Sequence, residues 1–379
     1  METITTKKRR PVVHFPAELE RQKFIGKLYG YFHSDSNEYN VVAYGEALNT
    51  TLPIIGQVVS EQRDLSETSD ELIGVWQNEK LIFQQGKRKC KGNSYELLLN
   101  IFSRNSGILE TGVMLNKAVI ISGCGSVGSL VALELARAGV GNFLLIDNDT
   151  MAYHNICRHQ CGTSDVGKFK VNAVRERISQ INPSAQVLTQ STILEEVPEN
   201  VFETFCDKGA VIVGCADNRE GDFYANKISC LFNIPFVSIG FWERAFAGEI
   251  FYSIPSKTPC YQCLFGDSEK RISQRVSVNR RVYTFEEDIA QTRFEPGIST
   301  DINFITTIGI KLILDLLNLD TPDYIPRLVN HLSQFSLICN TNDSQIGGEQ
   351  AEIFAYPLQV TTSIQVDSDE NCPTCQLKS

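Results

Sequence analysis

The sequence predicts an α/β protein with a doubly wound, mostly parallel sheet, preceded by a small α+β domain. Three observations support this prediction. From residue 118 onward, apolar strand-like runs alternate with helical segments of about 10–15 residues. A glycine-rich turn joins the first of these strands to the first helix, and two CxxC pairs follow further along the chain. With 379 residues, of which 42% are hydrophobic and 21% charged, the chain is long and apolar enough for such a core.

Residues 1–95 are expected to form the accessory domain, because their short strand-like runs are irregular and separated by polar clusters. The runs are Tyr39–Tyr44, Leu72–Trp76 and Lys80–Phe83. A helix predicted over residues 95–102 then leads into Ser103-Arg104-Asn105. Three roles for this domain stay open: substrate recognition, binding of a partner enzyme, or a degenerate peptidase-like module.

Residues 96–379 are expected to form the second domain, which holds the alternating pattern. Apolar runs predict strands at Ala118–Gly123, Phe143–Asp147, Gln186–Thr189, Ala210–Cys215 and Pro235–Ile239. Helical spacing predicts helices over Val127–Ala138, Lys170–Ile181, Gly221–Phe232 and Asn303–Leu319. Residues 266–295 are polar and charged, and we expect them to leave the core as a crossover insertion. Strands that alternate with helices in this way favour a parallel sheet.

The glycine-rich turn is the strongest local signal. Gly123, Gly125 and Gly128 follow an apolar strand and open a helix, and Asp147 ends the next strand about 20 residues further on. In a nucleotide-binding βαβ unit, such glycines permit a tight turn and close backbone approach. The helix N-terminus faces phosphate, and the acid accepts a hydrogen bond from a ribose hydroxyl. The pattern alone does not distinguish NAD from ATP.

Basic residues just beyond Asp147 favour ATP. Cleavage between the α- and β-phosphates builds negative charge that Arg158 and Lys170 would offset, with Mg²⁺ held by a carboxylate. Asp217 follows the strand at 210–215, at the sheet edge where ligands bind in such folds. The alternative for each residue is structural: surface ion pairs for the two cations and a helix cap for the acid.

The four cysteines of the CxxC pairs form the second strong signal. Cys260 and Cys263 in one pair, with Cys372 and Cys375 in the other, satisfy the tetrahedral preference of a structural Zn²⁺. Disulfides are the alternative, and they are disfavoured because a long chain with a nucleotide-binding pattern and no secretory signal indicates a cytoplasmic protein with reduced thiols.

Several of these segments together resemble the ThiF/MoeB/HesA adenylyltransferases of the ubiquitin-activating-enzyme-like superfamily. The resemblance runs from about Phe102 to the C-terminus and rests on GCGSVG, ARAGVGNFLLIDND, NICR, DVGKFKV and CADN. It implies a Rossmann-like sheet with a structural zinc. It also implies MgATP-dependent adenylation of the C-terminal carboxylate of a small protein or peptide.

The resemblance also assigns roles to individual residues. Asp147 would bind the ribose, with Asp149 in the same segment as part of the nucleotide site. Asn155, Arg158 and Lys170 would contact the phosphates. Two further assignments are Asp217 as the Mg²⁺ ligand and Arg104 as a finger that reaches the partner's ATP across a homodimer; an ordinary helix-terminal arginine is the alternative for Arg104.

The cysteines depart from the family pattern, because many members carry a nucleophilic cysteine after the first CxxC pair. No cysteine lies between Cys263 and Cys339, and Cys339 is most simply a core or strand thiol. The sequence leaves open whether Cys157 or Cys161 acts as a nucleophile. It also leaves open the effect of His159, which stands where the family often has glutamine. We therefore expect adenylation without an enzyme thioester.

The expected substrate is a small ubiquitin-like or sulfur-carrier protein, delivered afterwards to a separate conjugating enzyme or sulfur donor. Alternatives are a peptide adenylyltransferase resembling the microcin C biosynthesis enzyme, a tRNA-modifying dehydratase and a non-catalytic scaffold subunit of a heterodimer. An NAD oxidoreductase would not need Arg158, Lys170 or the zinc knuckles. The net charge of −10 argues against partners with anionic surfaces, so neither nucleic acid nor membrane is expected.

Overall fold

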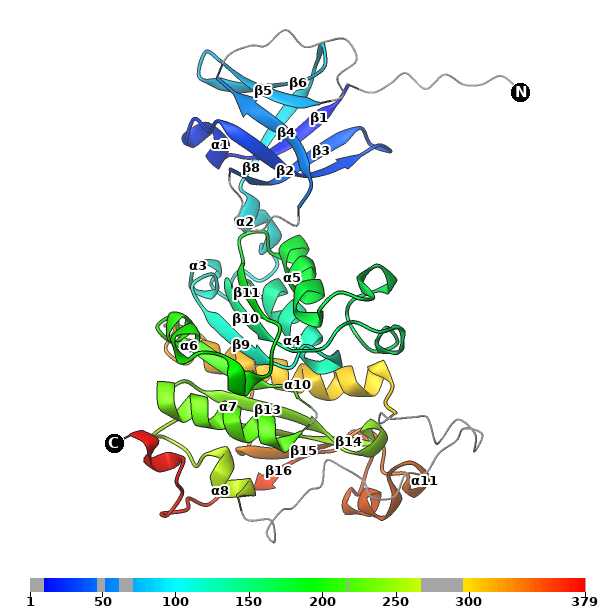
Figure 1. The fold of residues 1–379 in the computed structure, drawn as a ribbon, viewed down its shortest axis with the longest axis vertical. Helices are drawn as coiled ribbons and strands as arrows, with labels where there is room; N and C mark the ends of the chain where they lie inside the picture. The colour runs from blue at the N-terminus through cyan, green and yellow to red at the C-terminus, as the bar shows by residue number, and fades with distance from the viewer. Residues whose placement is uncertain (1–9, 46–51, 61–70, 217, 267–295, 379) are drawn as a thin grey trace, which may run out of the picture. The chain divides into compact units, whose positions relative to one another are not determined.

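The computed structural model describes residues 10–45, 52–60, 71–216, 218–266 and 296–378 (Figure 1). Contacts divide the chain into two compact units. The first unit comprises residues 1–111 and 179–186, and the second comprises residues 112–178 and 187–379. The predicted insertion at 266–295 lies almost entirely outside the described residues, and so does Asp217.

The first unit is built on an eight-stranded sheet with the strand order β7-β6-β5-β4-β2-β3-β1-β8. Its strands are β1 (Val12–Pro16), β2 (Gly26–His33), β3 (Glu38–Tyr44), β4 (Ile54–Val59), β5 (Leu72–Gln77), β6 (Lys80–Gln85), β7 (Arg88–Lys89) and β8 (Lys91–Tyr95). The helices α1 (Glu18–Arg21) and α2 (Leu97–Ile101) are short. The α+β expectation is therefore corrected to a mainly β unit, because a helix of one turn adds little to the core.

This sheet closes on itself. β7 and β8 stand at opposite ends of the strand order, but only Cys90 separates them along the chain. The Cys90 N–H donates to the Phe83 carbonyl in β6 at 2.9 Å, which joins the two ends. Apolar side chains that include Val13, Leu28 and Phe83 fill the interior. Closure removes the unpaired edges that an open sheet would expose.

The second unit contains the predicted nucleotide-binding sheet. Its strands, in spatial order, are β11 (Gln186–Gln190), β10 (Asn142–Ile146), β9 (Ala118–Ser122), β12 (Ala210–Gly214), β13 (Phe236–Phe241), β14 (Ala247–Ser253), β15 (Phe335–Cys339) and β16 (Val360–Ile364). β9 pairs in parallel with both β10 and β12, and β12 pairs in parallel with β13. This half of the sheet confirms the predicted α/β pattern.

The other half of the sheet is antiparallel. β14 pairs antiparallel with β13 and β15, and β16 pairs antiparallel with β15. β13 ends at Phe241 and β14 begins at Ala247, and this connection is too short for a parallel crossover. The expectation of a mostly parallel sheet is thus corrected to a mixed sheet. The prediction that Cys339 is a buried strand thiol is confirmed, since it ends β15 and is fully buried.

Helices cover the sheet of the second unit, as the alternating pattern predicts. They are α3 (Thr111–Met114), α4 (Ser126–Arg137), α5 (Lys170–Ile181), α6 (Glu199–Cys206), α7 (Arg219–Phe232), α8 (Tyr261–Phe265), α10 (Ser299–Leu317) and α11 (Ser344–Gly347). α4 and α10 contact each other, and α6 contacts α7. Every residue of β9, β10 and β12 is buried, as expected for strands that are covered on both faces.

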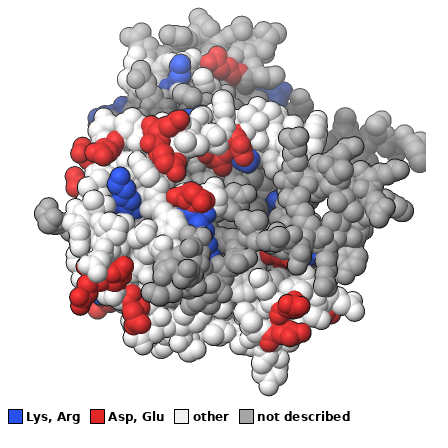
Figure 2. All heavy atoms as spheres, turned by 60° about the horizontal axis from the view of Figure 1, so that its bottom comes forward, with Lys and Arg blue, Asp and Glu red and all other residues white. Residues whose placement is uncertain are grey.

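No helix within the described part of the chain is long and apolar enough to cross a membrane. On the face shown in Figure 2, the acidic side chains of described residues are spread over the surface, and basic side chains stand among them. That distribution is consistent with the acidic balance of the sequence.

Candidate active site

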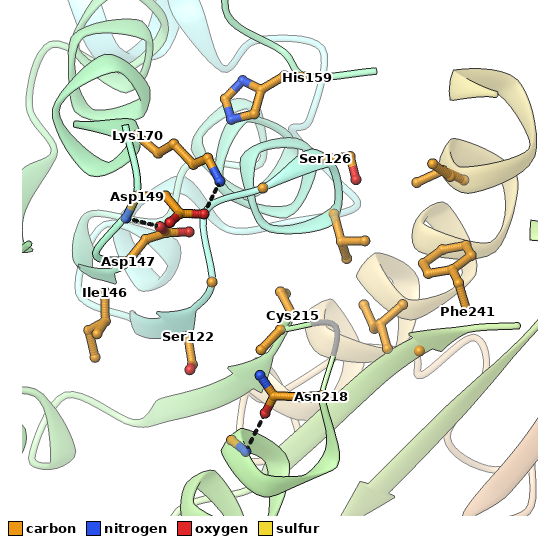
Figure 3. A pocket seen from close by; sticks show the side chains of 18 of the residues that line it. Ser122, Ser126, Ile146, Asp147, Asp149, His159, Lys170, Cys215, Asn218 and Phe241 are labelled. Carbon is orange, nitrogen blue, oxygen red and sulfur yellow. Dashed lines mark hydrogen bonds and ion pairs between the residues drawn. The ribbon is translucent and has the colours of Figure 1, made fainter. Parts of the chain in front are cut away.

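A cavity of about 530 Å³ opens at the carboxyl ends of β9, β10, β12 and β13. Such an edge is where α/β sheets bind ligands, and the volume suits a nucleotide-sized molecule. The predicted site residues that line it are Gly123, Gly125, Asp147, Asp149, Asn155, Arg158 and Lys170. Figure 3 shows several of these side chains directed into the cavity from different elements.

The three positions of the turn differ in why they carry glycine. Gly123 adopts φ +91°, a left-handed conformation that favours glycine. At Gly128, which is buried in α4, a Cβ would stand 1.8 Å from the Gly123 carbonyl oxygen. At Gly125, the N-cap of α4, a Cβ would meet nothing within 4 Å, and no side chain caps the helix. Gly125, Ser126 and Val127 line the cavity, so the N-terminal turn of α4 borders it, which suits an anion.

Asp147 follows β10, and its carboxylate is hydrogen-bonded to the backbone of the glycine turn. Its Oδ2 accepts from the Cys124 N–H at 2.6 Å. Its Oδ1 accepts from the Asp149 N–H at 2.8 Å (Figure 3). Burial raises the pKa of Asp147, whereas nearby Lys170 and the two N–H groups oppose that rise. Each carboxylate oxygen retains further acceptor capacity, so the residue can still accept a hydroxyl from a ligand.

Lys170 begins α5 and pairs with Asp149 inside the cavity. Its Nζ lies 2.6 Å from Asp149 Oδ2, and its side chain is only 11% exposed. Arg158 enters the same cavity from the loop after η1 (Tyr153–Asn155). Asn155 fixes that loop, since its Oδ1 accepts from the Ala152 N–H at 2.9 Å. Two cations thus border the space next to the glycine turn.

His159 is also hydrogen-bonded to the glycine turn: it contacts the Cys124 carbonyl, whereas Asp147 contacts the Cys124 N–H. It is buried, and its Nδ1 accepts from the Cys161 N–H at 3.0 Å. Its Nε2 therefore carries the proton and donates to the Cys124 carbonyl at 2.8 Å. Burial lowers the pKa of His159, which favours this neutral form. A glutamine carboxamide at this position would also offer one donor and one acceptor, as the His159 ring does.

Apolar side chains form one wall of the cavity, called the far wall here because it lies away from Asp147 and Lys170. It is formed by Ile239, Phe241 and Trp242 from the end of β13, with Ile302 from α10. Asn218 lines the cavity at the start of α7, where its Oδ1 accepts from the Gly221 N–H at 2.8 Å (Figure 3). This wall could receive an uncharged acyl chain. Sequence reasoning missed it because the wall depends on the antiparallel turn after β13.

Among the other predicted residues, Arg104, Cys157 and Cys161 do not line the cavity. Arg104 belongs to the first unit, where it is exposed in the turn after α2, and its role stays a prediction. Asp217 is outside the described residues, so its metal role also stays a prediction. Cys161 is buried and its pKa is raised to about 11, mainly by burial, which disfavours a nucleophilic thiolate. Cys157 is exposed.

The four predicted metal ligands come together in one cluster. Their sulfur atoms lie within 4.8 Å of one another, with Cys260 3.8 Å from Cys263 and 3.6 Å from Cys372, and Cys263 3.7 Å from Cys375. A tetrahedral zinc with four thiolates places its sulfurs about 3.8 Å apart. Among the described residues, this is the only group of three or more cysteine, histidine or acidic side chains arranged to hold a metal.

Two buried groups from α7 adjoin this cluster. Asn226 Oδ1 accepts from the Tyr261 N–H at 2.9 Å, and the Asn226 amide also lies beside the Cys260 thiol. The thiol of Cys230 raises the pKa of Cys260 most strongly, and the Asn226 amide opposes it. A buried amide beside a sulfur fits a site that holds thiolates on a cation.

The mixed sheet, with a glycine turn and a cavity at the carboxyl ends of its strands, defines a Rossmann-like α/β fold. A profile of the ThiF family matches residues 102–346. The chain belongs to the ThiF family.

Named relatives agree with this membership. The chain is 30% identical over 182 residues to the ubiquitin-like modifier-activating enzyme 5 of Dictyostelium discoideum, covering 44% of this chain and 47% of that one. It is 34% identical over 151 residues to the sulfur carrier protein ThiS adenylyltransferase of Bacillus subtilis, covering 39% and 43%. The chain therefore matches about half the length of these relatives or less.

Solved structures support the fold. The structure of E. coli MccB with ATP superposes with a TM-score of 0.51 at 20% identity, over 73% of this chain and 74% of that one. At this identity the likeness concerns the fold alone.

Proposed function

We propose that this protein uses ATP to adenylate the C-terminal carboxylate of a small ubiquitin-like or sulfur-carrier protein. The observation that carries the proposal is the cavity in which the open N-terminus of α4, the Asp147 carboxylate and the cations Arg158 and Lys170 meet. The relatives named as activating enzymes and adenylyltransferases support this class of reaction.

The side chains of the cavity suit each part of the reaction. Asp147 would accept a ribose hydroxyl, and the α4 N-terminus would face phosphate. The acceptor carboxylate oxygen attacks the α-phosphorus while the bond to the bridging oxygen breaks and pyrophosphate leaves. Negative charge grows on the phosphoryl oxygens in this step, and Arg158 and Lys170 would stabilise it. Mg²⁺ supplies further charge when bound, and we assign its carboxylate ligand to Asp217.

Lys170 has a second role in the proposal. In the structure its charge is held by Asp149 at 2.6 Å, which keeps the ammonium in the cavity before a nucleotide arrives. The phosphates of ATP would compete with the Asp149 carboxylate for the Lys170 ammonium. Because this ammonium already lies in the cavity, the Lys170 side chain would have to move little to bind them.

We propose that Zn²⁺ fills the four-cysteine cluster as a structural ion. Four thiolates complete a tetrahedral site and leave no open position for chemistry. The close approach of the thiols supports the assignment. The hydrogen bond with Cys260 is the larger cause and burial the smaller one, and together they raise the pKa of Cys263 to about 12. At neutral pH, thiols with such a raised pKa ionise only when a cation stabilises the thiolate.

We further propose that the adenylate passes directly to an outside nucleophile, without a thioester on this enzyme. The burial of Cys161 supports this step. A conjugating enzyme or sulfur donor would then receive the activated carrier. A homodimer in which Arg104 reaches the partner's nucleotide remains part of the same proposal.

Pyrophosphate exchange tests the proposed reaction. Full-length protein is incubated with ATP, labelled pyrophosphate and a ubiquitin-fold protein ending in glycine. The matched control is the same protein with its C-terminal carboxylate converted to an amide. We expect exchange only with the free carboxylate; equal exchange with both forms, or none with any carboxylate, would refute the proposal.

Two further arms refine the result. Exchange with a short peptide but not with the folded carrier would favour the peptide adenylyltransferase. Intact-mass measurement after the reaction should find no adduct on the enzyme that β-mercaptoethanol releases. Such an adduct would contradict direct transfer, and loss of the adduct in Cys157→Ser would identify its site.

A further inference from the structure

A buried polar network crosses the core of the second unit between the four-cysteine cluster and the far wall of the cavity. Its centre is an ion pair between Arg219, the first residue of α7, and Glu249 in β14. Arg219 Nη2 lies 3.0 Å from Glu249 Oε1, and their side chains are 8% and 2% exposed. Because separating a buried pair leaves an uncompensated charge, the two side chains hold each other in place.

Tyr261 connects this ion pair to the cysteine cluster. It follows Cys260 directly, and its hydroxyl accepts from Arg219 Nη1 at 2.9 Å and donates to Asp222 Oδ2 at 3.3 Å. The ring is fully buried among aromatic rings whose centroids lie 4.5–5.7 Å away: Phe223, Phe236, Phe251 and Phe265. Because Tyr261 is the next residue after Cys260 and its ring has little free space around it, a shift of the Cys260 backbone would be passed to the packed ring and its hydroxyl.

Trp242 connects the ion pair to the cavity. Its indole Nε1–H donates to Glu249 Oε2 at 3.1 Å, and the same residue lines the far wall. Arg219 also follows Asn218, which lines the cavity at the start of α7. Both oxygens of Glu249 are thus engaged, one by Arg219 and one by the cavity wall. A shift of the arginine changes two parts of the cavity together.

We propose that this network couples the four-cysteine site to the nucleotide cavity, with Tyr261 as the positioning residue that links them. Metal bound by the cysteines fixes Cys260, and through Tyr261, Arg219 and Glu249 it fixes Trp242. Loss of the metal loosens the cavity wall and weakens nucleotide binding. The inference rests on the proposed metal and nucleotide sites, and it assigns the metal a role beyond holding the fold.

Tryptophan fluorescence offers a readout that does not depend on activity. The chain has two tryptophans, Trp76 in the first unit and Trp242 in the cavity wall. In a Trp76→Phe background, the emission reports Trp242 alone. Zinc is removed from the full-length protein with a chelator, and ATP affinity is measured by calorimetry before and after. We expect the emission to change and the Kd for ATP to rise at least about fivefold, with recovery when zinc is restored.

Tyr261→Phe tests the link itself, since it keeps the packed ring and deletes only the hydroxyl. Its emission and its Kd should respond to zinc removal far less than those of the parent. Tyr224→Phe is the matched control: Tyr224 is a half-buried tyrosine of α7, the helix that carries Arg219, its ring contact is to Lys227, and this variant should respond as the parent does. Trp242→Phe is a second variant, which removes the indole N–H and should lose the zinc response of the Kd.

The outcomes separate the two proposals. Absence of zinc by elemental analysis, or no ATP binding by the parent, refutes the proposed metal or nucleotide site. A parent that binds both, yet keeps its Trp242 emission and Kd when zinc is removed with the fold intact by circular dichroism, refutes the coupling alone. So does a Tyr261→Phe variant that responds as strongly as Tyr224→Phe.

Discussion

His159 provides a prediction whose size follows from two hydrogen bonds. Substitution by leucine leaves the Cys124 carbonyl and the Cys161 N–H without their partners in a buried setting. Each unpaired buried group costs about 1–3 kcal/mol, so the loss of both partners in His159→Leu should lower the free energy of unfolding of the second unit by about 2–6 kcal/mol. His159→Gln supplies one donor and one acceptor, and should lose less than about 1 kcal/mol.

The pH dependence of the same residue gives an independent check. Burial lowers the pKa of His159 in the folded protein, while the hydrogen bond to the Cys124 carbonyl opposes this. The charged groups that act on the ring are Lys170, Asp147 and Asp165. Because the unfolded chain then binds the proton more readily, the neutral ring stabilises the fold above about pH 6.5, and this stability is lost as the pH falls below it. His159→Gln does not titrate there and should lack this loss.

Urea unfolding in the Trp76→Phe background measures both effects, because Trp242 reports the second unit only. The series is run at neutral pH and again at mildly acidic pH, with ATP affinity measured alongside. If the leucine variant is as stable as the parent, the two bonds do not hold the glycine turn. If glutamine costs as much as leucine, the shape of the ring matters and the hydrogen bonds do not.

Three further predictions concern the glycines, the lysines and the cysteines. Gly128→Ala should destabilise the second unit by at least about 1–3 kcal/mol, because its Cβ would meet the Gly123 carbonyl oxygen, whereas Gly125→Ala should keep the stability and weaken ATP binding. Calorimetry and urea unfolding separate the two; equal stabilities would refute the packing argument. Lys170→Met should slow pyrophosphate exchange by about 10²–10³-fold, while Lys168→Met, which removes an ammonium paired with Asp165 and Glu176, should leave it nearly unchanged. Cys372→Ser should release zinc by elemental analysis and lower the melting temperature; a variant that retains a full zinc content would remove Cys372 from the ligand set.

The nucleotide-binding half of the fold could be predicted because its signals are local. Gly123, Gly128 and Asp147 act within one βαβ unit, so the residues that create the geometry are close in sequence. The cysteine cluster was also predictable, since the ligand types are informative at any separation. The structure brings the four sulfurs together as the spacing suggested.

The remaining parts depend on pairings that the sequence does not display. β8 has the sequence KGNSY, which is typical of a loop, but it forms a strand because β1 supplies its backbone partners. The far wall of the cavity exists because β13 turns back into β14, which brings Trp242 and Glu249 within hydrogen-bond distance. His159 was noticed as unusual, but its role required knowing that the Cys124 carbonyl lies above it.

The four-cysteine cluster also orders events during synthesis of the chain. Cys260 and Cys263 leave the ribosome before α10, β15 and β16 are made, and Cys372 and Cys375 leave only afterwards. The glycine turn and its strands are made early, whereas the four-cysteine cluster can close only after the later strands have been produced. A nascent chain interrupted before Cys372 would therefore lack two of the four thiols that the cluster brings together.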